Sequence, residues 1–117
     1  MTEPYLGRIQ VSPRAIESIA GLAVLEAYGV VGMAPKDSRE YMAALLPRAN
    51  FRRGVEIKYD GAQVLIDLYV IIEYGTRISQ VAIGIKNRVK YLVERDTGLT
   101  VAQVNVHVQG LRVSPDA

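Results

Sequence analysis

The sequence predicts an α+β domain, a two-layer α/β sandwich in which two main helices cover one face of a small mixed sheet. Residues 64–72 are rich in β-branched and aromatic residues and carry one charge, Asp67, which is typical of a strand in the middle of a sheet. A stretch on each side of this segment repeats apolar residues at helical spacing. The length of 117 residues suits one domain with its own core.

The first part of the chain predicts a strand followed by a helix. Residues 6–11 form the expected strand. Ser12 and Pro13 are a typical helix start, with Ser as the N-cap and Pro in the first turn. The helix should end at Tyr28-Gly29. Gly21 lies within it and indicates close packing against the sheet.

The next segment is less regular. Residues 30–33 are apolar and form either a minor strand or a tucked loop, and residues 39–46 predict a short helix that Pro47 ends. A group of arginines then follows, and it has two interpretations. It is either an anion contact, for RNA or a lipid headgroup, or a solvated turn, which we prefer. The group consists of Arg48, Arg52 and Arg53.

A β-hairpin follows the arginines. Residues 54–59 alternate between apolar and polar side chains, and Asp60-Gly61 is a turn signal before residues 64–72. In that second strand one face is wholly apolar and must be covered. The other face is mixed and consists of Leu65, Asp67, Tyr69 and Ile71.

A long helix and a last strand complete the fold. Residues 78–95 carry a buried stripe at helical spacing, and Thr97-Gly98 closes the helix. The last strand covers residues 101–109, with Asn105, His107 and Gln109 on its polar side. The expected order is strand, helix, short helix, strand, strand, helix, strand. The domain should span residues 6–111, and residues 112–117 should be a flexible tail, with Leu111 already loose.

The composition excludes several classes of protein. Cysteine is absent, so disulfides and thiol chemistry are excluded and a reducing compartment is favoured. No apolar run approaches the roughly 20 residues of a membrane span, and the polar start of the chain is not a signal peptide. The net charge of +2 is too small to indicate nucleic acid binding by itself.

The residues do not predict an enzyme. His107 is the one histidine, and a strand histidine on a polar face is preferred over a general base or a metal ligand. Asp67 and Glu73 would lie about 20 Å apart along an extended strand, too far for a shared site. Neither a nucleophile motif nor a glycine-rich phosphate loop is present. We therefore expect no catalytic residues, no metal site and no cofactor.

Two binding functions remain open. An open sheet face can bind single-stranded RNA, but such faces stack bases on several aromatic side chains and this one offers Tyr69. The alternative is a protein-interaction domain whose face or edges pair with copies of itself or with another protein. The expected face consists of Arg8, Gln10, Glu56, Lys58, Asp67, Tyr69, Asn105, His107 and Gln109, with Leu65 and Ile71 as apolar spots.

The sequence resembles the bacterial alkaline shock protein and envelope stress response family. The matching pieces cover most of residues 6–111 in the family's order. The two that are specific as a pair are residues 66–75 (IDLYVIIEYG) and 104–110 (VNVHVQG); the others are 7–13 (GRIQVSP), 19–23 (IAGLA), 29–33 (GVVGM) and 54–57 (GVEI). One departure is Ser79, where family members often have Pro, and Ser also suits a helix start.

The resemblance implies a cytoplasmic, non-enzymatic protein linked to envelope stress. Some members assemble at the membrane through a small membrane-anchored partner. We therefore expect a self-associating scaffold, a homo-oligomer, held at the cytoplasmic side of the membrane by a protein partner. The expected interaction surface is Asp67, Tyr69, Asn105, His107 and Gln109. The alternative is a small RNA-binding α/β module that uses the sheet face and an anion contact at Arg48, Arg52 and Arg53.

Overall fold

The computed structural model describes residues 11–36 and 45–113. It confirms the expected fold class, an α+β sandwich with a mixed four-stranded sheet. The predicted strand at 6–11, apart from Val11, and most of the predicted helix at 39–46 lie outside the described residues, as do Arg8 and Gln10. The elements in chain order are α2 (Pro13–Leu25), β1 (Val30–Met33), the 3-10 helix η1 (Arg48–Gly54), β2 (Val55–Asp60), β3 (Gln63–Glu73), α3 (Ile78–Thr97) and β4 (Thr100–Arg112).

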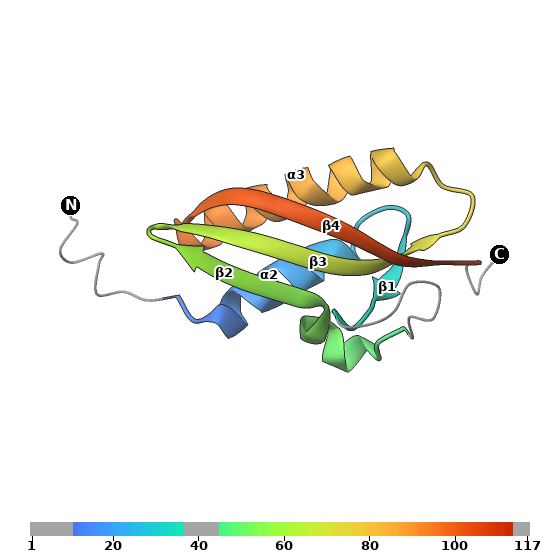
Figure 1. Ribbon diagram of the computed structural model, residues 1–117, viewed down its shortest axis with the longest axis horizontal. Helices are drawn as coiled ribbons and strands as arrows, with labels where there is room; N and C mark the ends of the chain where they lie inside the picture. Colours follow the sequence, from blue (N-terminus) through green and yellow to red (C-terminus); the bar gives the residue numbers. More distant parts are fainter. Residues whose placement is uncertain (1–10, 37–44, 114–117) are drawn as a thin grey trace.

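Strand β3 is the centre of the sheet. Strand β4 pairs with it in parallel along its whole length, from Gln63 to Glu73. Because β4 occupies one edge of β3, the two antiparallel partners share the other edge end to end (Figure 1). Strand β2 pairs with the first half of β3, and β1 pairs with Val70, Ile71 and Ile72 in the second half.

Both long helices pack on one face of this sheet (Figure 1). The apolar side of β3 that we predicted to be covered is fully buried, because every side chain from Val64 through Ile72 at even positions has no exposed surface. Helix α3 contributes the predicted stripe of Val81, Ile85 and Val89 to this core. The sheet face away from the helices carries the mixed side of β3.

One expected apolar spot on the open face is not available. Ile71 has no exposed surface, because it packs against Ala34 and Val31 at the β1 end of the sheet. The sequence could not show this cover, because the residues after β1 reach Ile71 only through the tertiary fold. Leu65 remains partly exposed, as expected.

Helix α2 starts as predicted. The Ser12 hydroxyl accepts a hydrogen bond of 3.1 Å from the Ala15 amide, and Pro13 occupies the first turn. Gly21 packs closely, but against Phe51 of η1 and not against the sheet. A Cβ atom at Gly21 would lie 2.2 Å from Cδ2 of Phe51, so this glycine sets the distance between α2 and η1.

Three segments differ from or refine the expectations. Residues 30–33 are a strand. The arginine segment is the 3-10 helix η1 instead of a turn. Strand β4 continues beyond Gln109, and Leu111 and Arg112 pair with the end of β3, so the expected looseness from Leu111 onward is wrong for these two residues. No helix in the described parts of the chain is long and apolar enough to cross a membrane.

Candidate interaction surface

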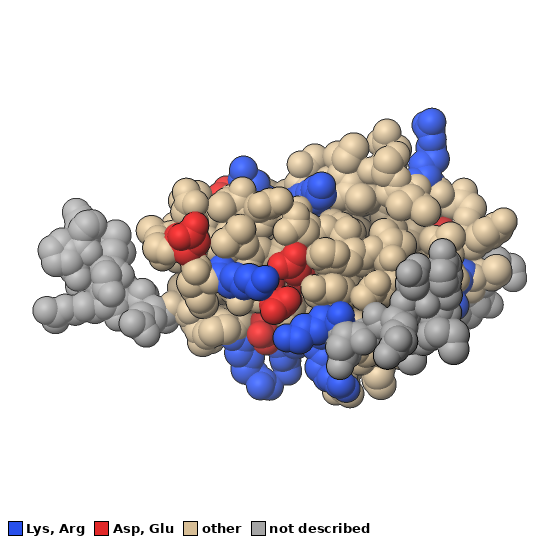
Figure 2. Space-filling view, viewed as in Figure 1, with Lys and Arg blue, Asp and Glu red and all other residues tan. Residues whose placement is uncertain are grey.

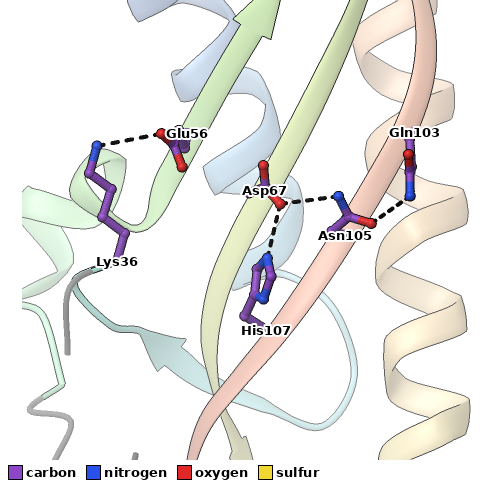
Figure 3. Close-up of polar contacts among 6 residues, drawn as sticks. All are labelled: Lys36, Glu56, Asp67, Gln103, Asn105 and His107. Carbon is purple, nitrogen blue, oxygen red and sulfur yellow. Dashed lines mark hydrogen bonds and ion pairs between the residues drawn. The ribbon is translucent and has the colours of Figure 1, made fainter. Parts of the chain in front are cut away.

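Four polar side chains that we predicted to share the open face lie in contact with one another. The sheet register places Asp67 of β3 opposite Asn105 of β4, and Tyr69 opposite His107. Asn105 Nδ2 donates a hydrogen bond of 3.1 Å to Asp67 Oδ1, and His107 Nε2 lies 2.9 Å from the same oxygen (Figure 3). We call these four residues the Asp67 network.

The histidine of this network is held on two sides. An ionised Asp67 can only accept a hydrogen bond, so Nε2 of His107 carries the hydrogen. In the neutral imidazole this leaves Nδ1 as an acceptor. The ring also stacks on Tyr69, with 4.5 Å between the ring centroids and 11° between the planes. His107 is therefore fixed in orientation while 42% of its side chain stays exposed.

The environment favours the charged form of Asp67. Only 12% of its side chain is exposed, and burial alone would raise the pKa of this carboxyl. The hydrogen bonds from His107 and Asn105 act in the opposite direction. Together with the nearby charges of His107 and Lys58, they hold the pKa of Asp67 below its ordinary value. The network thus carries a shielded negative charge at the centre of the sheet face.

A second carboxylate lies beside the network on β2. Glu56 is the cross-strand partner of Asp67, and two like charges in this position repel each other. Lys36 Nζ lies 3.8 Å from Glu56 Oε2 (Figure 3) and offsets part of that repulsion. Burial and the charges of Asp67 and Glu56 raise the pKa of Tyr69, which keeps its phenol neutral.

One residue predicted for this surface lies outside the Asp67 network, and one side chain that adjoins the network was not predicted. Val70 pairs with Val108 and Ile71 with Gly110, so Gln109 lies at an irregularity of β4 and faces no partner on β3. Gln103 was missed, although its Nε2 donates a hydrogen bond of 2.9 Å to Asn105 Oδ1 (Figure 3). The alternation of polar residues along β4, two positions before Asn105, could have indicated it.

The arginine segment contributes to a separate site. Arg52 and Arg53 line an open hollow of about 490 Å³, and Arg48 does not. Two further basic side chains that are distant in sequence, Arg14 and Lys36, also line the hollow and were not predicted. We call this site the basic hollow, and its lining consists of Arg14, Glu17, Pro35, Lys36, Ala49, Asn50, Arg52, Arg53 and Val55.

Arg52 has a structural role within the basic hollow. Its Nη1 donates a hydrogen bond of 3.2 Å to the Ser18 hydroxyl, and its guanidinium lies 5.2 Å from the centre of the Phe51 ring. These contacts connect η1 to α2. In the residues that the structure describes, no group of three His, Cys, Asp or Glu side chains is arranged to hold a metal ion.

A comparison with family models identifies the family of this chain. The family model that matches residues 1–113 is that of the alkaline shock protein 23 family, described as having a cell envelope-related function. The chain is 43% identical to YloU of Bacillus subtilis (strain 168) over 109 residues, which are 92% of this chain and 91% of YloU. It is 37% identical to Spy1614 of Streptococcus pyogenes serotype M6 over 108 residues, 92% of this chain and 89% of that protein.

Two more distant similarities complete the comparison. A stress response regulator gls24 homolog of Streptococcus pyogenes serotype M3 is 29% identical over 112 residues, which are 96% of this chain and 63% of that relative. Among solved structures, a zinc form of a MamM CTD variant matches with a TM-score of 0.50 and 13% identity, covering 86% of this chain and 87% of the other. This structural likeness supports the fold alone.

Proposed function

The chain belongs to the alkaline shock protein 23 family of envelope stress proteins, and from this premise we propose that it is a non-enzymatic, self-associating scaffold. A protein partner holds it at the cytoplasmic side of the membrane. None of the relatives described above carries the name of an enzyme. The Asp67 network is the surface through which copies of the chain associate.

The observation that carries this proposal is the ordered network on a sheet face that neither α2 nor α3 covers (Figure 1). Acidic and basic groups are interspersed on this face (Figure 2), as is typical of the polar part of an interface. Tyr69 and Leu65 supply partly exposed apolar surface between them. Because His107 is already fixed by Asp67 and Tyr69, little side-chain entropy is lost when a second surface binds.

Sedimentation velocity of the purified protein tests the surface. We expect the double variant Tyr69→Ala/His107→Ala to weaken self-association by about tenfold or more, the usual effect of removing two central interface residues. The matched control is Lys90→Ala/Tyr91→Ala, which removes one aromatic and one basic side chain exposed on α3. Circular dichroism checks that both variants fold. Equal association of the wild type and both variants would exclude this face as the interface.

The membrane partner requires a separate experiment. We would recover the tagged protein from detergent-solubilised cells with and without nuclease treatment. A small membrane protein recovered in both samples supports the scaffold and supplies a partner to map. RNA and RNA-processing proteins recovered only without nuclease would instead favour the alternative, a small RNA-binding module.

A further inference from the structure

The basic hollow has no part in the proposed scaffold surface, and we propose that it binds the phosphate group of a small ligand or of a lipid headgroup. The hollow lies between the start of α2, Pro35 and Lys36 beyond the end of β1, η1 and the first residue of β2. Basic side chains gather at this edge of the molecule, beside η1 and β2 (Figure 2). The proposal does not depend on self-association of the chain.

The charges in the hollow are poorly balanced by the protein itself. Four cationic side chains line it, and Glu17 is the one carboxylate in the lining. Within the described part of the chain, neither Arg14 nor Arg53 forms an ion pair or a side-chain hydrogen bond. Lys36 reaches Glu56 only at 3.8 Å. A bound anion would relieve this concentration of positive charge.

The position of Arg14 also favours an anionic ligand. It lies in the first turn of α2, where the helix dipole places partial positive charge and disfavours a cation. That turn contains no acidic residue. The partial positive charge at the helix start and the Arg14 guanidinium therefore act together at this side of the hollow. An anion is the ligand that both groups favour.

The lining also selects the class of anion. Arginine guanidinium groups donate paired hydrogen bonds that match the oxygen atoms of a phosphate. The volume of about 490 Å³ lies within the range of small-molecule pockets. The described lining contains no aromatic side chain, and the nearby Phe51 is buried against Gly21. Base stacking, on which single-stranded RNA binding relies, therefore has no platform here.

Binding of defined probes to the purified protein tests the proposal. Calorimetry with inorganic phosphate and glycerol 3-phosphate measures the free phosphate group. Sedimentation with phosphatidylglycerol vesicles, compared with phosphatidylcholine vesicles, measures the headgroup. Binding of either source supports the site, and the two arms distinguish which source is used. No binding of any phosphate probe would overturn it.

Three variants make the test specific to the hollow. We expect Arg14→Ala/Arg53→Ala to weaken binding by about tenfold or more, because each lost charge-assisted hydrogen bond is worth roughly one factor of ten. Glu17→Gln should tighten binding, by about twofold to fivefold, because it removes the carboxylate from the lining. Lys86→Ala/Lys90→Ala removes the same charge from exposed positions of α3 and should change binding by less than about twofold.

The same variants also define the results that would contradict the phosphate site. Equal losses in the α3 control and the arginine variant would indicate attraction by net charge and overturn the site. If the arginine variant does not fold, as judged by thermal melting, Glu17→Gln still decides, because unchanged binding would contradict the proposal. An oligouridine RNA that binds through Arg14 and Arg53 while the small phosphates do not would replace it with the RNA-binding alternative.

Discussion

Asp67 is a carboxylate that lies between two strands and depends on side chains from both of its neighbours. Asn105 and His107 of β4 donate to one of its oxygens, while Glu56 of β2 lies opposite with the same charge. Lys36 compensates Glu56 from the residues after β1. The sheet face is therefore a coupled set of charges, in which removing one partner changes the balance of the others.

The lowered pKa of Asp67 predicts a pH dependence of stability. The folded protein binds this proton more weakly than the unfolded chain, so the contribution is complete above the ordinary value of 3.8. It is lost as pH falls through the folded value. We expect Asp67→Asn to lower the free energy of unfolding by about 1–2 kcal/mol near pH 7. The difference from the wild type should shrink as the pH falls below this ordinary value of 3.8, as measured by urea unfolding.

Asp60→Asn supplies the control for this experiment, because Asp60 is exposed at the hairpin turn. It should change stability by less than about 0.5 kcal/mol. A constant difference between wild type and Asp67→Asn from pH 7 to pH 2 would contradict the role assigned to the Asp67 charge.

The sequence predicted which polar residues share the open face, but not all of their contacts. Alternation along the strands placed Asp67, Asn105 and His107 correctly, because side chains alternate strictly in a regular strand. Gln109 left this pattern at an irregularity of β4, and such a bulge has no local sequence signal here. Arg14 and Lys36 joined the basic hollow only through the packing of distant segments.

At the scale of the elements, two helical glycines have opposite roles. Gly21 of α2 lies against Phe51, and an added Cβ would overlap that ring. At Gly84 of α3 an added Cβ would meet no atom from outside its own helix turn within 4 Å. Phe51 is buried and fixed between α2 and η1, so its ring has little space to move. The first glycine is required by packing, and the second only lowers helix propensity.

We therefore expect opposite effects of the same substitution. Gly21→Ala should lower the free energy of unfolding by about 1–2 kcal/mol, because overpacking outweighs the gain in helix propensity. Gly84→Ala should raise it by about 0.5–1 kcal/mol. Urea unfolding of both variants measures these changes. Stabilisation by Gly21→Ala would show that Phe51 does not hold η1 against α2.

Elements with strong local signals were predictable, and those made by packing were not. The hairpin of β2 and β3 has an alternating pattern and a turn, and α3 has a buried stripe and a left-handed glycine cap at Gly98. Strand β1 has only four residues, too few to distinguish a strand from a loop. The 3-10 helix η1 depends on Phe51 filling the space beside Gly21, which periodicity cannot show.

At the scale of the whole molecule, the main feature is that the strands of the sheet differ in how many of their edges are paired. Among the described residues, β3 is paired on both sides, while β4, which is 13 residues long, pairs with β3 alone. Val101 and Val104 in its first half are buried in the core that α3 shares, whereas Val106 and Val108 remain partly exposed. A long edge strand of this kind offers free backbone groups to another strand.

Hydrogen exchange should reproduce this arrangement. We expect the amides of β3 to exchange most slowly, with protection approaching the full free energy of unfolding, about 5–15 kcal/mol for such a domain. In dilute protein, amides of residues 106–111 that do not pair with β3 should exchange much faster. Uniform protection of both strands at the lowest measurable concentration would contradict an open β4 edge.

Because β1 and β2 lie end to end on the same edge of β3, the end of β1 and the start of β2 reach neighbouring positions of β3, Val70 and Leu68. Both ends of the connection between them, Lys36 on one side and Arg52 and Arg53 on the other, line the basic hollow. The residues at both ends of the connection therefore link the sheet to the hollow. Insertions or deletions in this connection that keep Ala34 on Ile71 and Phe51 against Gly21 should change what the hollow recognises while the strands keep their register.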